Sequence, residues 1–119
     1  MKAVIYHNPR CSTSRKALGM IREAGLEPEV VEYLREPPTR ERLAALIADA
    51  GLGVRDAIRS KEAAYAELGL DDPSLGDDAL LDAMLREPVL IQRPFVQTAL
   101  GTRLGRPVDV IAEILPPVR

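Results

Sequence analysis

The sequence predicts an α/β fold with a mixed sheet, built from two half-sheets that a helical segment separates. Near the N-terminus, two apolar runs of strand character flank a stretch with helical apolar spacing, which indicates a βαβ unit. Near the C-terminus, strand-like runs precede one more helical stretch, which indicates a ββα unit. The residues between them, roughly 39–87, have helical periodicity. We therefore expect one domain over residues 1–119, with both faces of its sheet at least partly covered.

The first half-sheet is expected to begin with a buried strand over residues 3–6, where the sequence is AVIY. A helix should follow Cys11, and Gly25 is well placed to end it. The apolar residues of this helix, at helical spacing, are Ala17, Leu18, Ile21 and Ala24. A second strand is expected over residues 28–33, which contain Val30, Val31 and Tyr33. Because a helix separates the two strands, they should run parallel.

The middle segment is predicted to be a helical insertion. After a proline-rich break, Thr39 can cap a helix that ends near Gly51. Short helices are expected over residues 54–70, and a further helix should begin at Asp77 and stop before Pro88. The core candidates of this segment are Leu43, Leu46, Ile47, Ala50, Ile58, Tyr65, Leu68, Leu80, Leu81, Met84 and Leu85.

The second half-sheet is expected to contain strands over residues 89–91 and 95–98. A turn over residues 99–102 and a short strand around residues 103–104 should follow. The apolar face of the final helix contains Val108, Ile111, Ile114 and Leu115. This order of elements matches a thioredoxin-like sheet with a helical insertion.

Composition limits the possible functions. The chain has 119 residues, of which 46% are hydrophobic and 29% are charged, as is usual for a soluble globular domain. The formal net charge of -2 gives no indication of nucleic-acid binding, and no apolar run approaches the ~20 residues of a membrane span. One cysteine and one histidine exclude an internal disulfide and make a structural zinc site implausible. A free thiol is typical of a reducing compartment, so we expect a cytoplasmic protein without a metal.

Cys11 is the first candidate for chemistry, because it lies where a strand gives way to a helix. The unpaired N–H groups and the dipole of the helix favour a thiolate there, and the same groups can hold an oxyanion. A lone cysteine is more often an inert, buried residue. The preceding Pro9, the flanking Arg10 and Arg15, and the hydroxyls of residues 12–14 favour the reactive alternative.

Three segments, taken in order, resemble the motifs of the glutaredoxin-coupled arsenate reductases. They are YHNPRCSTSR at residues 6–15, QRPFV at residues 92–96 and GTRLGRP at residues 101–107. The resemblance runs from Val4 to about Leu115 and includes the helical middle. It implies a thioredoxin-like fold and an enzyme that reduces arsenate to arsenite. It further implies glutathione and glutaredoxin as electron donors, with no bound cofactor.

The resemblance also implies roles for individual residues. Cys11 matches the nucleophile, and three arginines match the oxyanion-binding residues: Arg59, Arg93 and Arg106. His7 matches a loop histidine that tunes the cysteine, and Ser14 matches a hydroxyl that supports the thiolate. Pro94 matches a proline that usually follows a cis peptide bond beside the active cysteine.

The reaction of a thiolate with arsenate explains why arginines would be needed in such a site. Arsenate and a thiolate repel each other, and the guanidinium group is a permanent cation whose planar fork of donors suits a tetrahedral oxyanion. The three arginines can meet at Cys11 only if the fold brings the insertion and the strand ends to its loop. The alternative is that they are ordinary surface residues. Arg93 is the least ordinary of them, because it precedes Pro94 between apolar runs.

Two other functions stay open. One is a non-enzymatic regulator that binds RNA polymerase, although Ser14 replaces the second cysteine of the C-x-x-C switch in that related branch. The other is a general glutathione-linked thiol reductase, because the segment from Cys11 to Ser14 resembles a monothiol glutaredoxin. Arginines that converge on Cys11 would favour the oxyanion enzyme, and an open apolar groove would favour a peptide or glutathione substrate. In every enzymatic case an external thiol is required, because the chain has no second cysteine.

Overall fold

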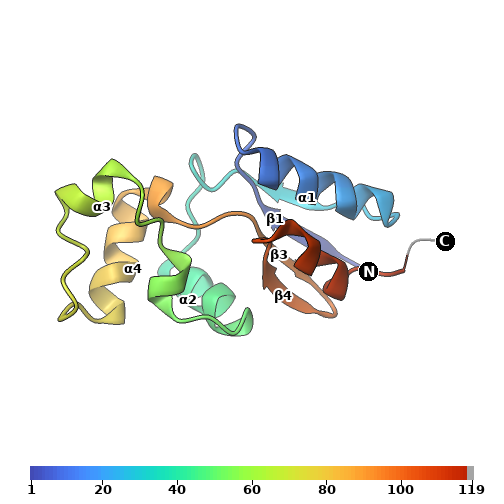
Figure 1. The fold of residues 1–119 in the computed structure, drawn as a ribbon. Coiled ribbons are helices and arrows are strands. Elements are labelled where there is room, and N and C mark those ends of the chain that lie inside the picture. Colours follow the sequence, from blue (N-terminus) through green and yellow to red (C-terminus); the bar gives the residue numbers. More distant parts are fainter. Residues whose placement is uncertain (118–119) are drawn as a thin grey trace. The chain divides into compact units, whose positions relative to one another are not determined.

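The computed structural model describes residues 1–117, and the chain divides into two compact units (Figure 1). One unit combines Met1–Glu36 with the chain from Arg93 onward and contains the sheet. The other unit is Pro37–Gln92 and contains the helical segment expected between the half-sheets. We call them the sheet unit and the helical unit.

The sheet unit has a four-stranded mixed sheet with the strand order β2-β1-β3-β4. The strands are β1 (Ala3–Tyr6), β2 (Glu29–Val31), β3 (Phe95–Thr98) and β4 (Gly101–Leu104). β1 is parallel to β2 and antiparallel to β3, and β3 is antiparallel to β4. Ile5 of β1 lies opposite Val30 on one side and Val96 on the other. The predicted mixed sheet and its parallel pair are thus confirmed.

Two helices of the sheet unit pack on one face of this sheet. They are α1 (Ser12–Glu23) and the 3₁₀ helix η3 (Val108–Ile114). Their shared core contains Ala3, Ile5, Ala17, Ile21, Val96, Ile111 and Ile114. Because side chains alternate along a strand, Tyr6 and Phe95 point to the opposite face, where both are buried.

Gly25 ends α1, as the sequence predicts. Its φ of 88° lies in the left-handed region that glycine adopts without steric cost. The N–H of Gly25 donates to the carbonyl of Arg22 at 3.0 Å, and the N–H of Leu26 donates to the carbonyl of Ile21 at 3.2 Å. These bonds satisfy carbonyls of the last turn and direct the chain back to β2.

The helical unit contains three α-helices and two 3₁₀ helices in its described residues. They are α2 (Arg40–Asp49), η1 (Val54–Ala57), α3 (Ala63–Glu67), α4 (Asp77–Arg86) and η2 (Pro88–Leu90). Thr39 caps α2 as predicted, since its Oγ1 accepts the N–H of Arg42 at 3.1 Å. The buried apolar side chains include Leu43, Leu46, Ile47, Leu80, Leu81, Met84 and Leu90.

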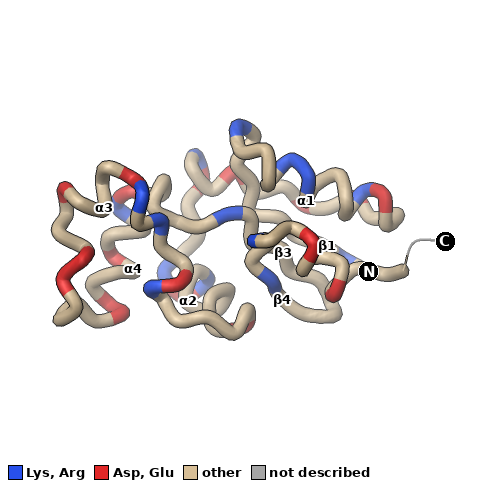
Figure 2. The backbone as a smooth tube through the Cα atoms, viewed as in Figure 1, with Lys and Arg blue, Asp and Glu red and all other residues tan. Residues whose placement is uncertain are grey.

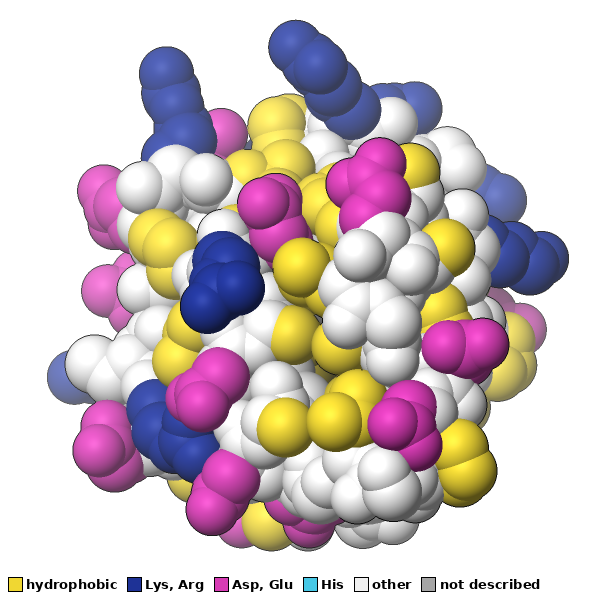
Figure 3. All heavy atoms as spheres, turned by 90° about the vertical axis from the view of Figure 1, so that its left-hand side faces the viewer, with side chains coloured by type: hydrophobic (Ala, Val, Ile, Leu, Met, Phe, Trp, Pro, Cys, Tyr) yellow, Lys and Arg dark blue, Asp and Glu magenta, His cyan; other side chains and the backbone are white. Residues whose placement is uncertain are grey.

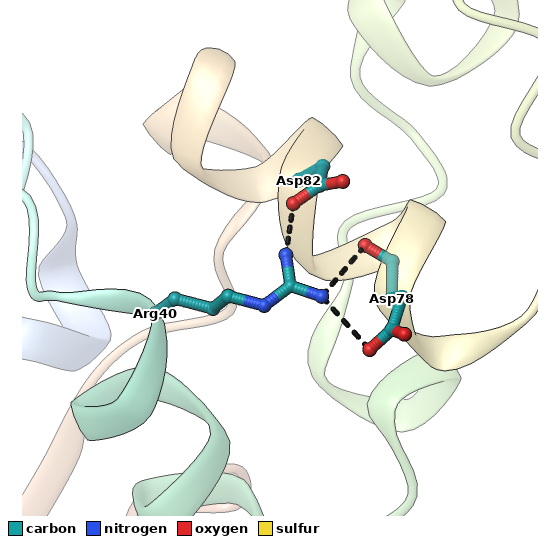
Figure 4. Close-up of polar contacts among 3 residues, drawn as sticks. All are labelled: Arg40, Asp78 and Asp82. Carbon is teal, nitrogen blue, oxygen red and sulfur yellow. Dashed lines mark hydrogen bonds and ion pairs between the residues drawn. The ribbon is translucent and has the colours of Figure 1, made fainter.

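Arg40 joins α2 to α4 on the surface of the helical unit (Figure 4). Its Nη2 lies 2.8 Å from Asp78 Oδ1, and its Nη1 contacts Asp82. Exposed pairs of this kind contribute little because solvent screens them, so apolar burial dominates the stability of the unit. Figure 3 shows acidic, basic and apolar side chains interspersed on the visible surface.

The prediction of a strand over residues 89–91 is wrong. Pro88 instead begins η2, and Ile91 forms only an isolated antiparallel bridge with Ile58. A three-residue apolar run fits a buried strand or a buried helical turn equally well, and proline at the first helical position favours the turn.

Some details of the expected core and boundaries are also corrected. Tyr65 is half-buried and Leu68 is 36% exposed, whereas Leu70 is buried in the same region. Half-buried positions among the other candidates are Leu18, Ala24, Val31, Ala50, Leu85, Val108 and Leu115, and Val30 is exposed. The turn before β4 is shorter than expected because β4 begins at Gly101, and the final helix is 3₁₀.

No helix in the described part of the chain is long and apolar enough to cross a membrane.

Candidate functional site

Cys11 occupies the N-cap position of α1, directly after the loop that leaves β1. Its backbone is extended, with φ −93° and ψ 122°, and its carbonyl accepts the N–H of Arg15 at 3.0 Å. The free thiol is half-buried. Cys11 therefore lies at the strand-to-helix turn that the sequence predicts, beside the first N–H groups of the helix.

The loop before Cys11 is held by local hydrogen bonds to its backbone groups. The carbonyl of Asn8 accepts the N–H of Cys11 at 3.0 Å, and the Asn8 Oδ1 accepts the N–H of Arg10 at 3.0 Å. Arg15 Nη1 donates to the carbonyl of Pro9 at 2.9 Å. Sequence reasoning assigned no role to Asn8, although asparagine before proline is a recognised turn signal.

The environment of Cys11 favours the thiolate. Burial is the largest single influence, and it raises the pKa of the thiol. The backbone N–H of Ser14, the charge and hydrogen bond of Arg93, and the backbone N–H of Thr13 act in the opposite direction. Together they outweigh burial and lower the pKa of Cys11 below its ordinary value. The thiol forms no capping hydrogen bond of standard geometry, so these groups act chiefly once it is ionised.

His7 and Ser14 form a buried pair under this loop. His7 Nδ1 lies 2.6 Å from Ser14 Oγ, which also accepts the N–H of Asn8 at 3.0 Å. Burial lowers the pKa of His7, an effect that Arg15 reinforces and Glu32 opposes. In the neutral tautomer protonated at Nε2, His7 Nδ1 accepts a hydrogen bond from the Ser14 hydroxyl. The Ser14 side chain therefore holds the loop, while its backbone N–H supports Cys11.

Arg93 lies in the same unit as Cys11 and is followed by a cis peptide bond to Pro94, as the resemblance implies. Within residues 1–117, the Nε of Arg93 is buried and has no hydrogen-bond partner. A buried donor without an acceptor is costly. Arg93 thus presents one N–H that an oxyanion could satisfy, while its guanidinium also stabilises Cys11.

Arg106 belongs to the sheet unit as well. Its Nη1 donates to the carbonyl of Arg93 at 3.3 Å, and the N–H of Gly105 donates to the carbonyl of Pro94 at 2.8 Å. These bonds hold the two arginine-bearing segments side by side. The Arg106 side chain is otherwise exposed and available to an anion.

Arg59 lies in the helical unit. Its Nε donates to Glu62 Oε1 at 3.0 Å, and its backbone N–H donates to the carbonyl of Leu90 at 2.7 Å. Two of the three predicted arginines therefore share a unit with Cys11. The participation of Arg59 in the site stays a prediction.

The sheet unit thus combines a sulfur whose surroundings favour the thiolate with a cation that has a donor without an acceptor in residues 1–117. This arrangement suits attack on an electrophile whose oxygens are anionic, because the cation offsets the repulsion between two anions. Among the residues that the structure describes, no three histidine, cysteine, aspartate or glutamate side chains could hold a metal ion.

Comparisons with known proteins find a matching family and similar chains. The model of the ArsC family matches residues 6–114. An arsenate reductase of Rhizobium meliloti is 62% identical over 98% of this chain and 83% of its own length. One from Escherichia coli is 54% identical over 94% and 79%. A solved arsenate reductase from Vibrio cholerae superimposes with a TM-score of 0.92 at 46% identity, covering 97% of this chain and 98% of its own.

Proposed function

The chain belongs to the ArsC family, and from that premise we propose how it works as an arsenate reductase. It is an oxidoreductase with the thioredoxin-like fold of its relatives, and arsenate is its substrate. We propose that Cys11 is its nucleophile and that glutathione and glutaredoxin supply the electrons. The observation that carries this proposal is the Cys11 thiol, which the helix N-terminus and Arg93 bias toward the thiolate.

Binding of arsenate would begin with Arg93. Its buried Nε can donate to one arsenate oxygen, and its charge offsets the repulsion between the anion and the Cys11 thiolate. Arg106 is tied to the Arg93 carbonyl and supplies a second cation. Arg59 is the third predicted contact.

The first chemical step is a substitution without reduction. The Cys11 thiolate forms a bond to arsenic, and one arsenic–oxygen bond breaks. The hydroxyl group that leaves takes a proton from solvent and departs as water. Arsenic stays in the +5 state, and the negative charge on the remaining oxygens is held by the arginines.

The second step is the reduction. The thiolate of glutathione attacks Cys11 Sγ, so that a sulfur–sulfur bond forms and the sulfur–arsenic bond breaks. The electron pair of that bond stays on arsenic, which is reduced from +5 to +3 and leaves as arsenite. The two sulfur atoms are oxidised together by two electrons, giving a mixed disulfide between Cys11 and glutathione.

Regeneration needs an outside thiol because Cys11 is the chain's only cysteine. A glutaredoxin thiolate attacks the glutathione sulfur, and Cys11 leaves as a thiolate. A leaving thiol of low pKa departs faster, so the environment that activates Cys11 also aids its release. All electrons come from thiols, so this route uses no bound cofactor, and it requires the reducing conditions of a cytoplasm.

The test is arsenate-dependent NADPH oxidation, coupled through glutathione reductase, glutathione and glutaredoxin. Cys11→Ser should abolish turnover, and Arg93→Ala should lower kcat about 100-fold, as expected for loss of a donor that stabilises developing charge. Arg103→Ala is the matched control, because Arg103 is in the same unit but pairs with Glu113. Turnover by the Cys11→Ser variant, or an equal loss of kcat in Arg93→Ala and Arg103→Ala, would contradict the proposal.

A further inference from the structure

An open groove lies beside the active-site loop, between α1 and the segment after β4. Its volume is about 420 Å³, and it is lined by Thr13, Lys16, Arg106, Pro107 and Val108. All five residues belong to the sheet unit. A groove of this size is large for arsenate and is in the range of small-molecule sites.

Both walls of the groove are connected to the Cys11 thiol. Thr13 lines one wall, and its backbone N–H is among the groups that favour the thiolate. Arg106 lines the other wall and donates to the carbonyl of Arg93, whose side chain hydrogen-bonds to Cys11. A molecule held in the groove would therefore lie close to groups that act on the Cys11 sulfur, where the second chemical step takes place.

The groove carries positive charge that the fold does not explain. The first turn of α1 has no acidic residue, although the helix dipole favours acidic side chains there. Lys16 follows at this end of the helix, is exposed, and forms no ion pair with any residue in the described range 1–117. Figure 2 shows basic residues near this end of α1. Lys16 and Arg106 thus place two cations at one groove in a chain of net charge -2.

We propose that this groove binds glutathione and that Lys16 is a positioning residue that holds one of its carboxylates. The inference rests on the function proposed above and assigns glutathione a binding place. Glutathione is a tripeptide with two carboxylates and one ammonium group, so its net negative charge complements the cations Lys16 and Arg106 of the groove. With a carboxylate on Lys16, its cysteine thiol can reach the Cys11 sulfur for the attack that releases arsenite.

Steady-state kinetics can separate this role from a general electrostatic one. Lys16→Ala should raise the KM for glutathione about 3-fold, and Lys16→Glu more, as loss or reversal of one exposed charge pair predicts. The KM for arsenate and the pH profile of Cys11 alkylation should not change. Lys2→Ala, an exposed lysine of the same unit away from the groove, is the matched control. An equal rise in the KM for arsenate, or no rise in that for glutathione, would overturn the proposal.

Direct binding tests the inference without arsenate turnover. S-methylglutathione has no free thiol, so its binding to the wild-type chain can be followed by amide chemical shifts. The shifts should cluster at Thr13, Lys16 and Val108, weaken in Lys16→Glu and persist in Lys2→Ala. Shifts elsewhere, or equal affinity in both variants, would contradict the groove. Binding at the groove by a chain that fails to turn over arsenate would refute the proposed function, and it would retain the groove only as a glutathione-binding site.

Discussion

The state of the Cys11 sulfur depends on a balance between burial and nearby donors. Burial favours the neutral thiol, whereas the N–H groups at the start of α1 and the Arg93 guanidinium favour the thiolate. Each pKa unit in this balance corresponds to about 1.36 kcal/mol between the two protonation states. Removing one donor should therefore have a measurable effect on thiol reactivity.

The first prediction concerns Arg93. Arg93→Ala removes a hydrogen bond and a positive charge from Cys11, so the pKa of the thiol should rise and alkylation by iodoacetamide at pH 7 should slow. The rate is measured against pH, and its midpoint reports the pKa. Arg103→Ala should behave as the wild type. Coincident profiles for all three chains would show that Arg93 does not tune Cys11.

The second prediction concerns His7. Its pKa is lowered in the folded chain, so between that pKa and about 6.5 the unfolded chain binds more protons. Stability linked to His7 is therefore complete above about pH 6.5 and is lost as pH falls through the folded pKa. Urea unfolding at about pH 7.5 and pH 5.5 should show this loss. His7→Asn should make this loss of stability at the lower pH smaller. A loss as large as that of the wild type would show that His7 does not cause it.

At the scale of elements, the sequence anticipated what apolar periodicity and turn residues specify. Residues 3–6 and the helix after Cys11 have unambiguous periods and a glycine stop, and both occur as predicted. Residues 89–91 were misassigned because three apolar residues define no period. Whether Tyr65 or Leu70 is buried depends on tertiary packing, which local spacing does not contain.

Prediction of the site was limited in the same way, because local sequence does not specify tertiary contacts. Cys11 and the cis bond before Pro94 followed from motif and resemblance. The hydrogen bonds of Asn8 are local, and its position before Pro9 is a turn signal that sequence reasoning overlooked. The open position of Lys16 depends on how separate segments meet, which local sequence does not contain.

The third prediction concerns Gly105, between β4 and the Arg106 segment. An added Cβ would lie 2.6 Å from Ile111 Cδ1 and 3.2 Å from Pro94 Cγ, so Gly105→Ala must displace packed side chains. We expect a loss of about 1–3 kcal/mol in the free energy of unfolding by urea. Gly19→Ala is the control: nothing lies within 4 Å of its added Cβ, and at this exposed position of α1 it should stabilise by about 0.5–1 kcal/mol. Equal effects would contradict the close packing.

At the scale of the whole molecule, the residues predicted for the site belong to both units. Cys11, Arg93 and Arg106 lie in the sheet unit, and Arg59 lies in the helical unit. The predicted contribution of Arg59 to catalysis therefore needs a direct test.

The fourth prediction separates catalysis by Arg59 from its ion pair with Glu62. Arg59→Ala should lower kcat/KM for arsenate about tenfold or more if the guanidinium holds the oxyanion. Glu62→Ala breaks the same ion pair and keeps the guanidinium, so it should change kcat/KM little. Similar losses in both variants would assign Arg59 a structural role only.

The most direct measurement is the mass of the chain after reaction with arsenate and glutathione in the absence of glutaredoxin. The mechanism predicts that the chain gains one glutathione, that peptide mapping places it on Cys11, and that dithiothreitol removes it. The glutathione adduct should form only when arsenate is present, with about one arsenite released per modified chain. Modification that does not depend on arsenate, or arsenite released without modification of Cys11, would contradict the account.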